Sequence, residues 1–241
     1  MQHYFVDSQN YFFDHAIIKG SDVHHITHVM RQKVGDFIVV LNNQGQAHKA
    51  KIIEMSKDLI KVLFVCEWPL HHPKARITVA QALIKKDHFE EACIKMTECG
   101  VFAFMPLLTE RCVIKWDEKD IPKKLERTQL LMKEASEQSE RLFLPKLHSL
   151  FSITNLPYGE YDVVFVAHAR EETNHYAKIL STLDLQQSIL LLVGPEGGFT
   201  EKEIDFLTSK GAISLSFGHT ILRSETAALA FLSVVRFLLE E

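Results

Sequence analysis

The sequence has few cysteines, no long apolar run and no strong excess of charge. Its 241 residues include four cysteines and no CxxC pair, which excludes a disulfide framework and a structural zinc site. No apolar run reaches the roughly 18 residues of a membrane helix, and the start, MQHYFVDSQN, does not resemble a signal peptide. We therefore expect a cytoplasmic protein with no membrane partner.

The charge balance argues against a protein that binds nucleic acid with its whole surface. The formal net charge is −4, whereas such a protein is expected to be basic. Residues 1–72 hold seven Lys or Arg and seven Asp or Glu, so the acidic excess falls in the remainder. Any contact with RNA must therefore be local.

Two patterns divide the chain near residue 72. Short alternating runs at 36–42, 47–55 and 58–66 indicate a small β-barrel or sandwich. The segment Trp68–Pro73 then interrupts the pattern with two prolines, which favour an extended backbone before them. We predict one domain over residues 1–72 and a second over 73–241.

The second part alternates strands with helices, which is typical of an α/β fold with a parallel sheet. The expected strands are 77–84, 101–108, 162–167, 189–193 and 213–217. After the first strand, Asp87 is predicted to cap a helix that ends at Gly100, with Glu90 three positions after the cap. The core stripe of this helix is expected to be Phe89, Ala92, Cys93 and Met96.

The sharpest local motif is Gly194-Pro195-Glu196-Gly197-Gly198-Phe199-Thr200, directly after an apolar strand. Its glycines allow a ligand to approach the backbone closely, and strand ends of open α/β sheets bind ligands. Thr200 and Glu203 form a capping box, which favours a helix start there. Neither GxGxxG nor GxxxxGK[ST] is present, so neither nicotinamide nor nucleoside triphosphate is favoured. An ordinary strand-to-helix turn remains the alternative.

A second loop of similar style, residues 216–228, contains Arg223, Ser224 and Glu225. Ser224 can cap the last helix, and Glu225 can favour its start through the helix dipole, so a purely structural role remains open for both. The same dipole disfavours a cation, and Arg223 therefore indicates an anionic partner.

Two further clusters have structural interpretations. The run 133–141 is helical by propensity, and Glu137 with Arg141 is expected to form a surface ion pair. His24 and His28 are spaced to share a metal, with His25 between them, but they lack carboxylate or cysteine partners. We expect no metal.

Taken together, LLVGPEGGFTEKEI and FGHTILRSETA resemble the RsmE family of 16S ribosomal RNA (uracil-N3) methyltransferases, of the SPOUT class. Four other stretches share the resemblance: VMRQKVGD at 29–36, the series Lys85, Asp87, Glu90, Lys95, Glu98 and Gly100, TERCVIKW at 109–116, and EQSER at 137–141. The resemblance spans nearly the whole chain.

This resemblance implies a small N-terminal PUA-like barrel that binds RNA, followed by a SPOUT α/β domain tied in a deep trefoil knot. It implies S-adenosylmethionine as the cofactor, a homodimer, and 16S ribosomal RNA or the small ribosomal subunit as the substrate. Two rivals remain: another SPOUT enzyme with a different target nucleotide, and a non-catalytic RNA-binding assembly protein.

The resemblance also implies the site residues. The candidates for catalysis are Arg223, for an anionic uracil, and Glu225, for the N3 proton. The cofactor residues are expected to be Leu192, Gly194, Pro195, Glu196, Gly197, Gly198, Phe217, Gly218, Ile221, Leu222, Arg223, Thr226 and Ala227. The substrate RNA is expected to contact Arg31, Lys33, Lys85, Arg111, Gln138 and Arg141.

Overall fold

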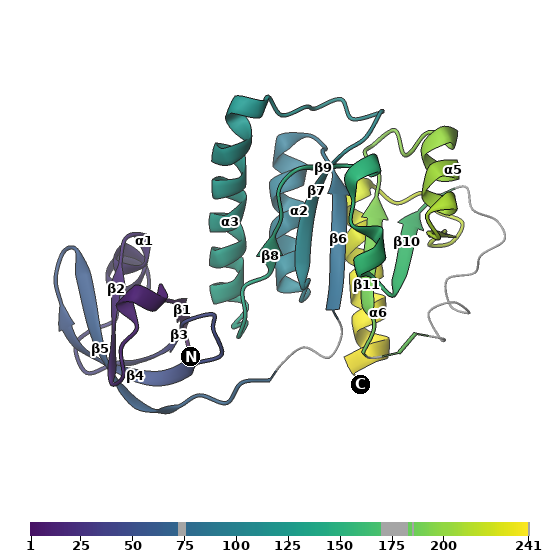
Figure 1. The fold of residues 1–241 in the computed structure, drawn as a ribbon. Helices are drawn as coiled ribbons and strands as arrows, with labels where there is room; N and C mark the ends of the chain where they lie inside the picture. The colour runs from purple at the N-terminus through teal and green to yellow at the C-terminus, as the bar shows by residue number, and fades with distance from the viewer. Residues whose placement is uncertain (72–75, 170–182, 185, 241) are drawn as a thin grey trace. The chain divides into compact units, whose positions relative to one another are not determined.

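The computed structural model describes residues 1–71, 76–169, 183–184 and 186–240, and the chain divides into two compact units (Figure 1). The N-terminal unit comprises Met1–His72 together with Lys133–Leu144. The C-terminal unit comprises Pro73–Met132 and Pro145–Glu241. The last turns of helix α3 (Ile121–Gln138) therefore belong to the N-terminal unit, although they come much later in the chain.

A five-stranded sheet forms the N-terminal unit. In pairing order, its strands are β1 (His3–Phe5), β3 (Phe37–Leu41), β4 (Ala47–Met55), β5 (Leu59–Glu67) and β2 (His15–Lys19). β1 runs parallel to β3, and the other neighbours are antiparallel. The strands predicted at 36–42, 47–55 and 58–66 are thus confirmed.

Short helical turns complete this unit. A 3-10 turn covers Ser8–Asn10, and the His-rich stretch forms α1 (Ser21–His24) followed by a π-helical turn (His25–Val29). Ile26, from this last turn, is fully buried in the core of the sheet. The stretch is therefore anchored to the core by an apolar residue.

The two faces of the N-terminal sheet are covered differently. On the inner face, Ile18, Ile38, Ile52 and Ile60 are buried in a single core cluster, as expected for strands in which alternate side chains point the same way. The outer face carries a smaller cluster. Its members are Phe5, Val39, Leu41 and Ala47, packed against Trp68, Leu70, Leu142 and Leu144.

Helix α3 ends in a buried group of charges within the N-terminal unit. The Lys133 ammonium lies 2.8 Å from the Asp22 carboxylate and 2.7 Å from the Glu137 carboxylate. Glu137 also accepts a hydrogen bond of 2.9 Å from the backbone N–H of Phe5 in β1. The predicted surface pair of Glu137 with Arg141 is therefore wrong, because the Glu137 side chain points into the unit.

The described part of the C-terminal unit contains a seven-stranded parallel sheet. In pairing order, the strands are β12 (Ile213–Leu215), β10 (Val163–Ala167), β11 (Ser188–Val193), β6 (Arg76–Ala82), β7 (Ala103–Leu108) and β8 (Lys146–Leu147), and β9 (Phe151–Ser152) also pairs with β7. Short 3-10 turns lie at Glu118–Asp120, Ile153–Asn155 and Tyr158–Glu160. The predicted strands and the α/β class are confirmed.

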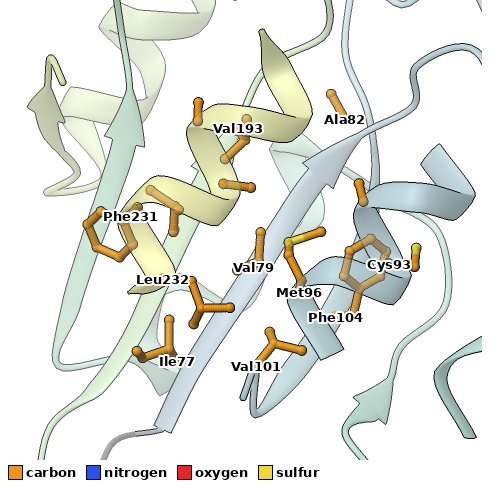
Figure 2. Packing of buried hydrophobic residues seen from close by; sticks show 14 of the residues in the cluster. Ile77, Val79, Ala82, Cys93, Met96, Val101, Phe104, Val193, Phe231 and Leu232 are labelled. Atoms are coloured by element: carbon orange, nitrogen blue, oxygen red, sulfur yellow. The ribbon is translucent and has the colours of Figure 1, made fainter. Parts of the chain in front are cut away.

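Helices pack on both faces of this sheet. Helices α2 (Lys86–Glu98) and α6 (Ser224–Glu240) share one core cluster with Ile189, Leu191 and Val193 of β11. Figure 2 shows Met96 of α2 and Leu232 of α6 beside Val79 of the central strand β6. Helix α5 (Glu201–Ser209) packs on the opposite face, where Leu207 joins Leu190 and Leu192.

The stripe predicted for α2 is buried as expected, but its cap is not Asp87. The N-cap position is Lys85, without a side-chain cap, and Asp87 lies in the first turn. There its carboxylate still interacts favourably with the helix dipole. Glu90 accepts two hydrogen bonds from Arg127 of α3, at 2.6 and 2.8 Å, and so joins the two helices rather than closing a capping box.

The buried Glu137 predicts how stability changes with pH. Burial and the nearby Asp22 raise the pKa of Glu137 to about 7 from 4.5, so the folded state binds more protons than the unfolded state between these values. The contribution of this group is fully present below pH 4.5 and is lost as the pH rises through 7, by up to about 1.4 kcal/mol per unit. Urea unfolding across pH 4.5–7.5 should show a flatter profile for Glu137→Gln than for the unmodified chain. Identical slopes for the two proteins would contradict a raised pKa.

Candidate functional site

Two loops at the carboxyl edge of the parallel sheet are held together by hydrogen bonds. The first loop, residues 194–200, follows β11, and the second loop, residues 216–223, follows β12. Ser224, at the end of the second loop, donates its hydroxyl hydrogen to the carbonyl of Gly194 at the start of the first. The two motifs that the sequence singled out therefore form one site.

Glycines shape the first loop. Gly198 has a φ of 66° and donates its N–H to the Pro195 carbonyl at 2.8 Å, which closes a tight turn. At Gly194, a side chain would lie 3.2 Å from both the backbone of Gly198 and the ring of Phe199. The loop thus folds back on its own start, and Gly194 leaves room for this close approach.

The helix after the first loop begins as predicted. The Thr200 hydroxyl accepts a hydrogen bond from the N–H of Glu203, and the Glu203 carboxylate accepts one from the N–H of Thr200. The capping box is confirmed. Because both ends of the loop are held, by Gly194 and by Thr200, the peptide groups between them have little freedom to move.

A segment after β7 holds the first loop from the outside. Arg111 donates from one guanidinium nitrogen to the carbonyls of Gly197 and Phe199, at 2.9 and 3.1 Å. The N–H of Glu110 donates to Glu203 at 2.8 Å. Arg111 was predicted as an RNA contact, and the structure places it on the loop backbone, a role that the sequence did not indicate.

The second loop is anchored to the core by Phe217 and Leu222, and other residues of it are exposed. Phe217 packs edge-on against Phe231 of α6, with ring centroids 6.0 Å apart, while Gly218 has a φ of 102°. Ile221 is 81% exposed, and Arg223 is also exposed. This loop therefore exposes the apolar side chain of Ile221 and the cationic side chain of Arg223, both of which a ligand can contact.

Ser224 does not cap α6 through its side chain as expected. The first helical hydrogen bond runs from Ala227 N–H to the Arg223 carbonyl, and the Ser224 hydroxyl is engaged elsewhere. It donates to Gly194 and accepts a hydrogen bond of 2.7 Å from the side-chain amide of Gln81. The serine thus stabilises the loop pair and not the helix end.

Gln81 is a site residue that the sequence analysis missed. It lies at the end of β6, is fully buried, and gives its amide hydrogens to Ser224 and to the Ala82 carbonyl. Its side-chain oxygen has no hydrogen-bond partner among the residues that the structure describes. Since a buried acceptor without a partner is costly, this oxygen points to a bound donor group. A glutamine inside the mainly apolar run 77–84 was the available signal.

The start of α2 borders both loops. The N–H of Lys85 donates to the Glu196 carboxylate of the first loop at 3.3 Å. His88, in the first turn of the helix, lies 3.5 Å from the Glu225 carboxylate at the start of α6. The predicted first-turn position of Glu225 is confirmed. The histidine beside it is a second neighbour that the sequence analysis did not identify.

The structure brings most predicted cofactor residues together, with two qualifications. The side chains of Leu192 and Ala227 are buried in the core, Leu192 on the α5 side of the sheet and Ala227 on the opposite side. Each can therefore contribute mainly its backbone to a ligand. The exposed members of the set include Glu196 and Gly197 in the first loop, Gly218 in the second loop, and Thr226 in the first turn of α6.

The predicted RNA residues fall in both units. Lys85 and Arg111 belong to the C-terminal unit and lie at the loops described above. The other four belong to the N-terminal unit: Arg31, Lys33, Gln138 and Arg141. Arg31 is exposed with a φ of 53°, and Arg141 donates to the Phe143 carbonyl at 3.2 Å.

The His-rich stretch has stacked rather than converging imidazoles. The rings of His24 and His28 lie 4.5 Å apart and nearly parallel, and His25 pairs with the Tyr4 hydroxyl at 3.0 Å. Over the described residues, no group of three or more potential ligands is placed to hold a metal ion. In the same part of the chain, no helix has the length and apolar character needed to span a bilayer.

Two family models match the chain. Residues 71–236 match an RNA methyltransferase domain, and residues 18–65 match an RNA methyltransferase PUA domain. Among curated proteins, the ribosomal RNA small subunit methyltransferase E of Bacillus subtilis (strain 168) is 35% identical, over 98% of this chain and 96% of its own length. The enzyme of the same name from Rickettsia conorii is 33% identical, over 90% and 86%.

Solved structures have the same fold. A protein described as hypothetical is 34% identical, with a TM-score of 0.87 and 99% of both chains covered. A protein from Legionella pneumophila, assigned as a methyltransferase and solved with the bound cofactor SAM, is 25% identical. Its TM-score is 0.85, with 98% of this chain and 96% of that chain covered.

Removal of the Ser224 hydroxyl should be costly. Ser224→Ala leaves the Gly194 carbonyl and the Gln81 amide buried without their partner, at a cost of about 2–3 kcal/mol in unfolding free energy. Ser233→Ala, on the exposed side of the same helix, should change it by less than about 0.5 kcal/mol. Urea denaturation of both variants measures the difference, and equal stabilities would mean that the loops are held by other contacts.

Proposed function

The chain belongs to the RNA methyltransferase family, and from this premise we propose that it methylates N3 of a uridine in 16S ribosomal RNA, with S-adenosylmethionine as donor. The family match and the curated relatives confirm the resemblance to the RsmE family that the sequence motifs indicated. One observation carries the proposal. A relative named for ribosomal RNA small subunit methylation is similar over both units, and not only over the domain common to RNA methyltransferases.

The site described above fits S-adenosylmethionine. The first and second loops offer backbone groups in close approach, and the buried Gln81 oxygen lacks a partner among the described residues. The cofactor carries amino, ammonium and hydroxyl donors, any of which can satisfy such an acceptor. The Legionella relative, with the same fold and 25% identity, was solved with this cofactor bound. We infer that Gly194–Gly198 and Phe217–Ala227 hold it.

S-adenosylmethionine, when bound, supplies an electrophilic methyl group on sulfur. The residues of this chain then have to position the uracil and deal with its N3 proton. Glu225 is our candidate for accepting that proton, because its carboxylate is half-buried at the loops and has His88 at 3.5 Å. Arg223, exposed beside it, is suited to stabilise the negative charge that develops on the base.

RNA contacts are proposed from both units. Arg31, Lys33, Gln138 and Arg141 belong to the N-terminal unit, which we assign to the RNA-binding PUA-like domain over residues 1–72 with the end of α3. Lys85 and Arg111 lie near the first loop. Arg111 uses one nitrogen for the loop carbonyls. Its remaining donors are available to phosphate oxygens, because a guanidinium has five N–H groups.

A homodimer is proposed because the second half of α6 exposes apolar side chains in the single chain. Val234 is 36% exposed, Phe237 65% and Leu238 47%, and their spacing of three and four residues places them on one face of the helix. A contiguous exposed apolar face of this kind marks an interaction surface. Light scattering should give twice the chain mass of 27.6 kDa, and Phe237→Asp should give a monomer where Thr208→Asp, at an exposed position of α5, does not. A monomeric unmodified chain would remove this part of the proposal.

We place the protein in the cytoplasm, where small ribosomal subunits are assembled.

The trefoil knot also remains a prediction. A knot is a property of the whole chain path, and residues 170–182, between β10 and β11, lie outside the described part of the chain.

The direct test is methyl transfer from labelled S-adenosylmethionine to small subunits that lack the modification, followed by mass-spectrometric mapping of the methylated nucleotide. We expect one uridine to be methylated at N3. Methylation of a ribose or another base would identify a different SPOUT activity. No transfer together with no cofactor binding in calorimetry would identify a non-catalytic RNA-binding protein.

In single turnovers of the same reaction, Glu225→Gln should slow transfer by about a hundredfold at neutral pH and below. The loss should shrink at high pH, where hydroxide can take the N3 proton. Cofactor affinity should not change. The matched control is Glu201→Gln, which alters a first-turn glutamate of α5 instead. Unchanged rates for Glu225→Gln at low pH would remove this residue from the mechanism.

A further inference from the structure

The outer face of the N-terminal sheet carries a row of side chains that the proposed function does not explain. Strand register pairs Phe37 of β3 with Lys51 of β4, Lys51 with Leu63 of β5, and Leu63 with His15 of β2. Cross-strand partners of this kind lie on the same face of a sheet. We call Phe37, Lys51, Leu63 and His15 the outer row.

The outer row points away from the core. The residues next to it along each strand, Ile38, Ile52, Val62 and Ala16, are all completely buried in the inner cluster. Because successive side chains of a strand alternate between faces, the row itself faces outward. Phe37 is accordingly 40% exposed and Leu63 42% exposed, which is unusual for large apolar residues at the middle of a sheet.

Both ends of the row are aromatic. At one end, the ammonium of Lys49 lies 4.8 Å from the centre of the Phe37 ring. At the other, the rings of Phe12 and His15 are stacked at 4.6 Å, only 16° from parallel. Phe12 is 44% exposed, and its neighbour Phe13 is 101% exposed. With strands about 4.8 Å apart, the two ends are roughly 14 Å from each other, which is too far for a single base to contact both.

The charges along the row are mainly positive. Lys49 and Lys51 lie on β4 beside Phe37, and Lys61 of β5 lies opposite Ile17 of β2, next to His15 along that face. Asp14 is engaged with the His15 ring at 2.7 Å. The exception is Glu54, which is the register partner of Lys61 on β4. Residues 1–72 have equal numbers of basic and acidic side chains. The lysines on this face therefore form a local cationic area and do not reflect an overall positive charge.

The remaining part of the same face is covered by the unit itself. Val39, two residues after Phe37 and therefore on the same face, packs under Trp68, Leu70, Leu142 and Leu144. The aliphatic part of the face is thus sealed by the chain. The aromatic and basic part of the face stays exposed to solvent, as the exposed fractions of Phe37 and Leu63 show.

We propose that the outer row binds unpaired nucleotides of the RNA substrate. One base stacks on Phe37 and another on Phe12 or Phe13, while Lys49 and Lys51 contact the phosphates between them. Aromatic rings on an open sheet face with interleaved cations are the arrangement by which proteins bind single-stranded RNA. The inference rests on the proposed function, since the RNA is taken to be the one that the C-terminal unit methylates.

The test compares two exposed phenylalanines in similar surroundings. Phe102, in the C-terminal unit, is 39% exposed and has the Arg76 guanidinium 6.0 Å from its ring centre. Binding of a fluorescent oligouridine of about 12 nucleotides, and of a duplex of equal length, is measured by anisotropy. Phe37→Ala should weaken oligouridine binding about tenfold, and Phe102→Ala should leave it unchanged. Circular dichroism melting confirms that both variants are folded.

The lysines are tested by salt dependence. Lys51→Gln should reduce the slope of log affinity against log salt by about 0.7, the value for one phosphate contact on a single strand. Lys119→Gln, an exposed lysine outside the N-terminal unit, should not. An unchanged slope for Lys51→Gln, or equal affinities for Phe37→Ala and the unmodified chain, would overturn the proposal.

Two other results would overturn it as well. If duplex binds as tightly as oligouridine, the row does not select unpaired bases. If Phe37→Ala alters the mass in light scattering, the row is an interface with a second copy of the chain. Failure of the proposed function is separate, because it would appear as absent methyl transfer by the unmodified chain while oligouridine binding persists.

Discussion

A hydrogen bond between the Ser224 hydroxyl and the Gly194 carbonyl holds together two loops that are 30 residues apart in the sequence. The bond is buried, and the side-chain amide of Gln81 in β6 donates a second hydrogen bond to the same hydroxyl. Buried hydrogen bonds of this kind are costly to break, because each partner is left without water. The shape of the space between the loops, and therefore the identity of its ligand, depends on this contact.

Other residues around the two loops also restrict their movement. Arg111 holds the carbonyls of the first loop, and the capping box at Thr200 holds its far end. The start of α2 approaches through Lys85 and Glu196, and through His88 and Glu225. A methyl transfer that depends on positioning benefits from such restraint, because a pocket held in advance does not have to be ordered when the substrate binds.

Much of this arrangement could be predicted from the sequence, because local patterns determine it. The strands, the stripe of α2 and the capping box at Thr200 all follow from periodicity and short-range hydrogen bonding. Gln81 and His88 were missed because their importance comes from partners far away along the chain. The burial of Glu137 was missed for the same reason. Its spacing from Arg141 indicates a surface pair, but in the folded unit the partners of Glu137 are the N–H of Phe5 in β1 and the Lys133 ammonium.

The central claim is that the loops at 194–200 and 216–223 together form the cradle of the methyl donor. A crystal structure of the chain grown with S-adenosylmethionine tests it most directly. The account predicts the cofactor between these loops, with one of its donor groups within hydrogen-bond distance of the Gln81 oxygen. A cofactor bound elsewhere, or a Gln81 oxygen satisfied by a protein group while the cofactor is present, would contradict it.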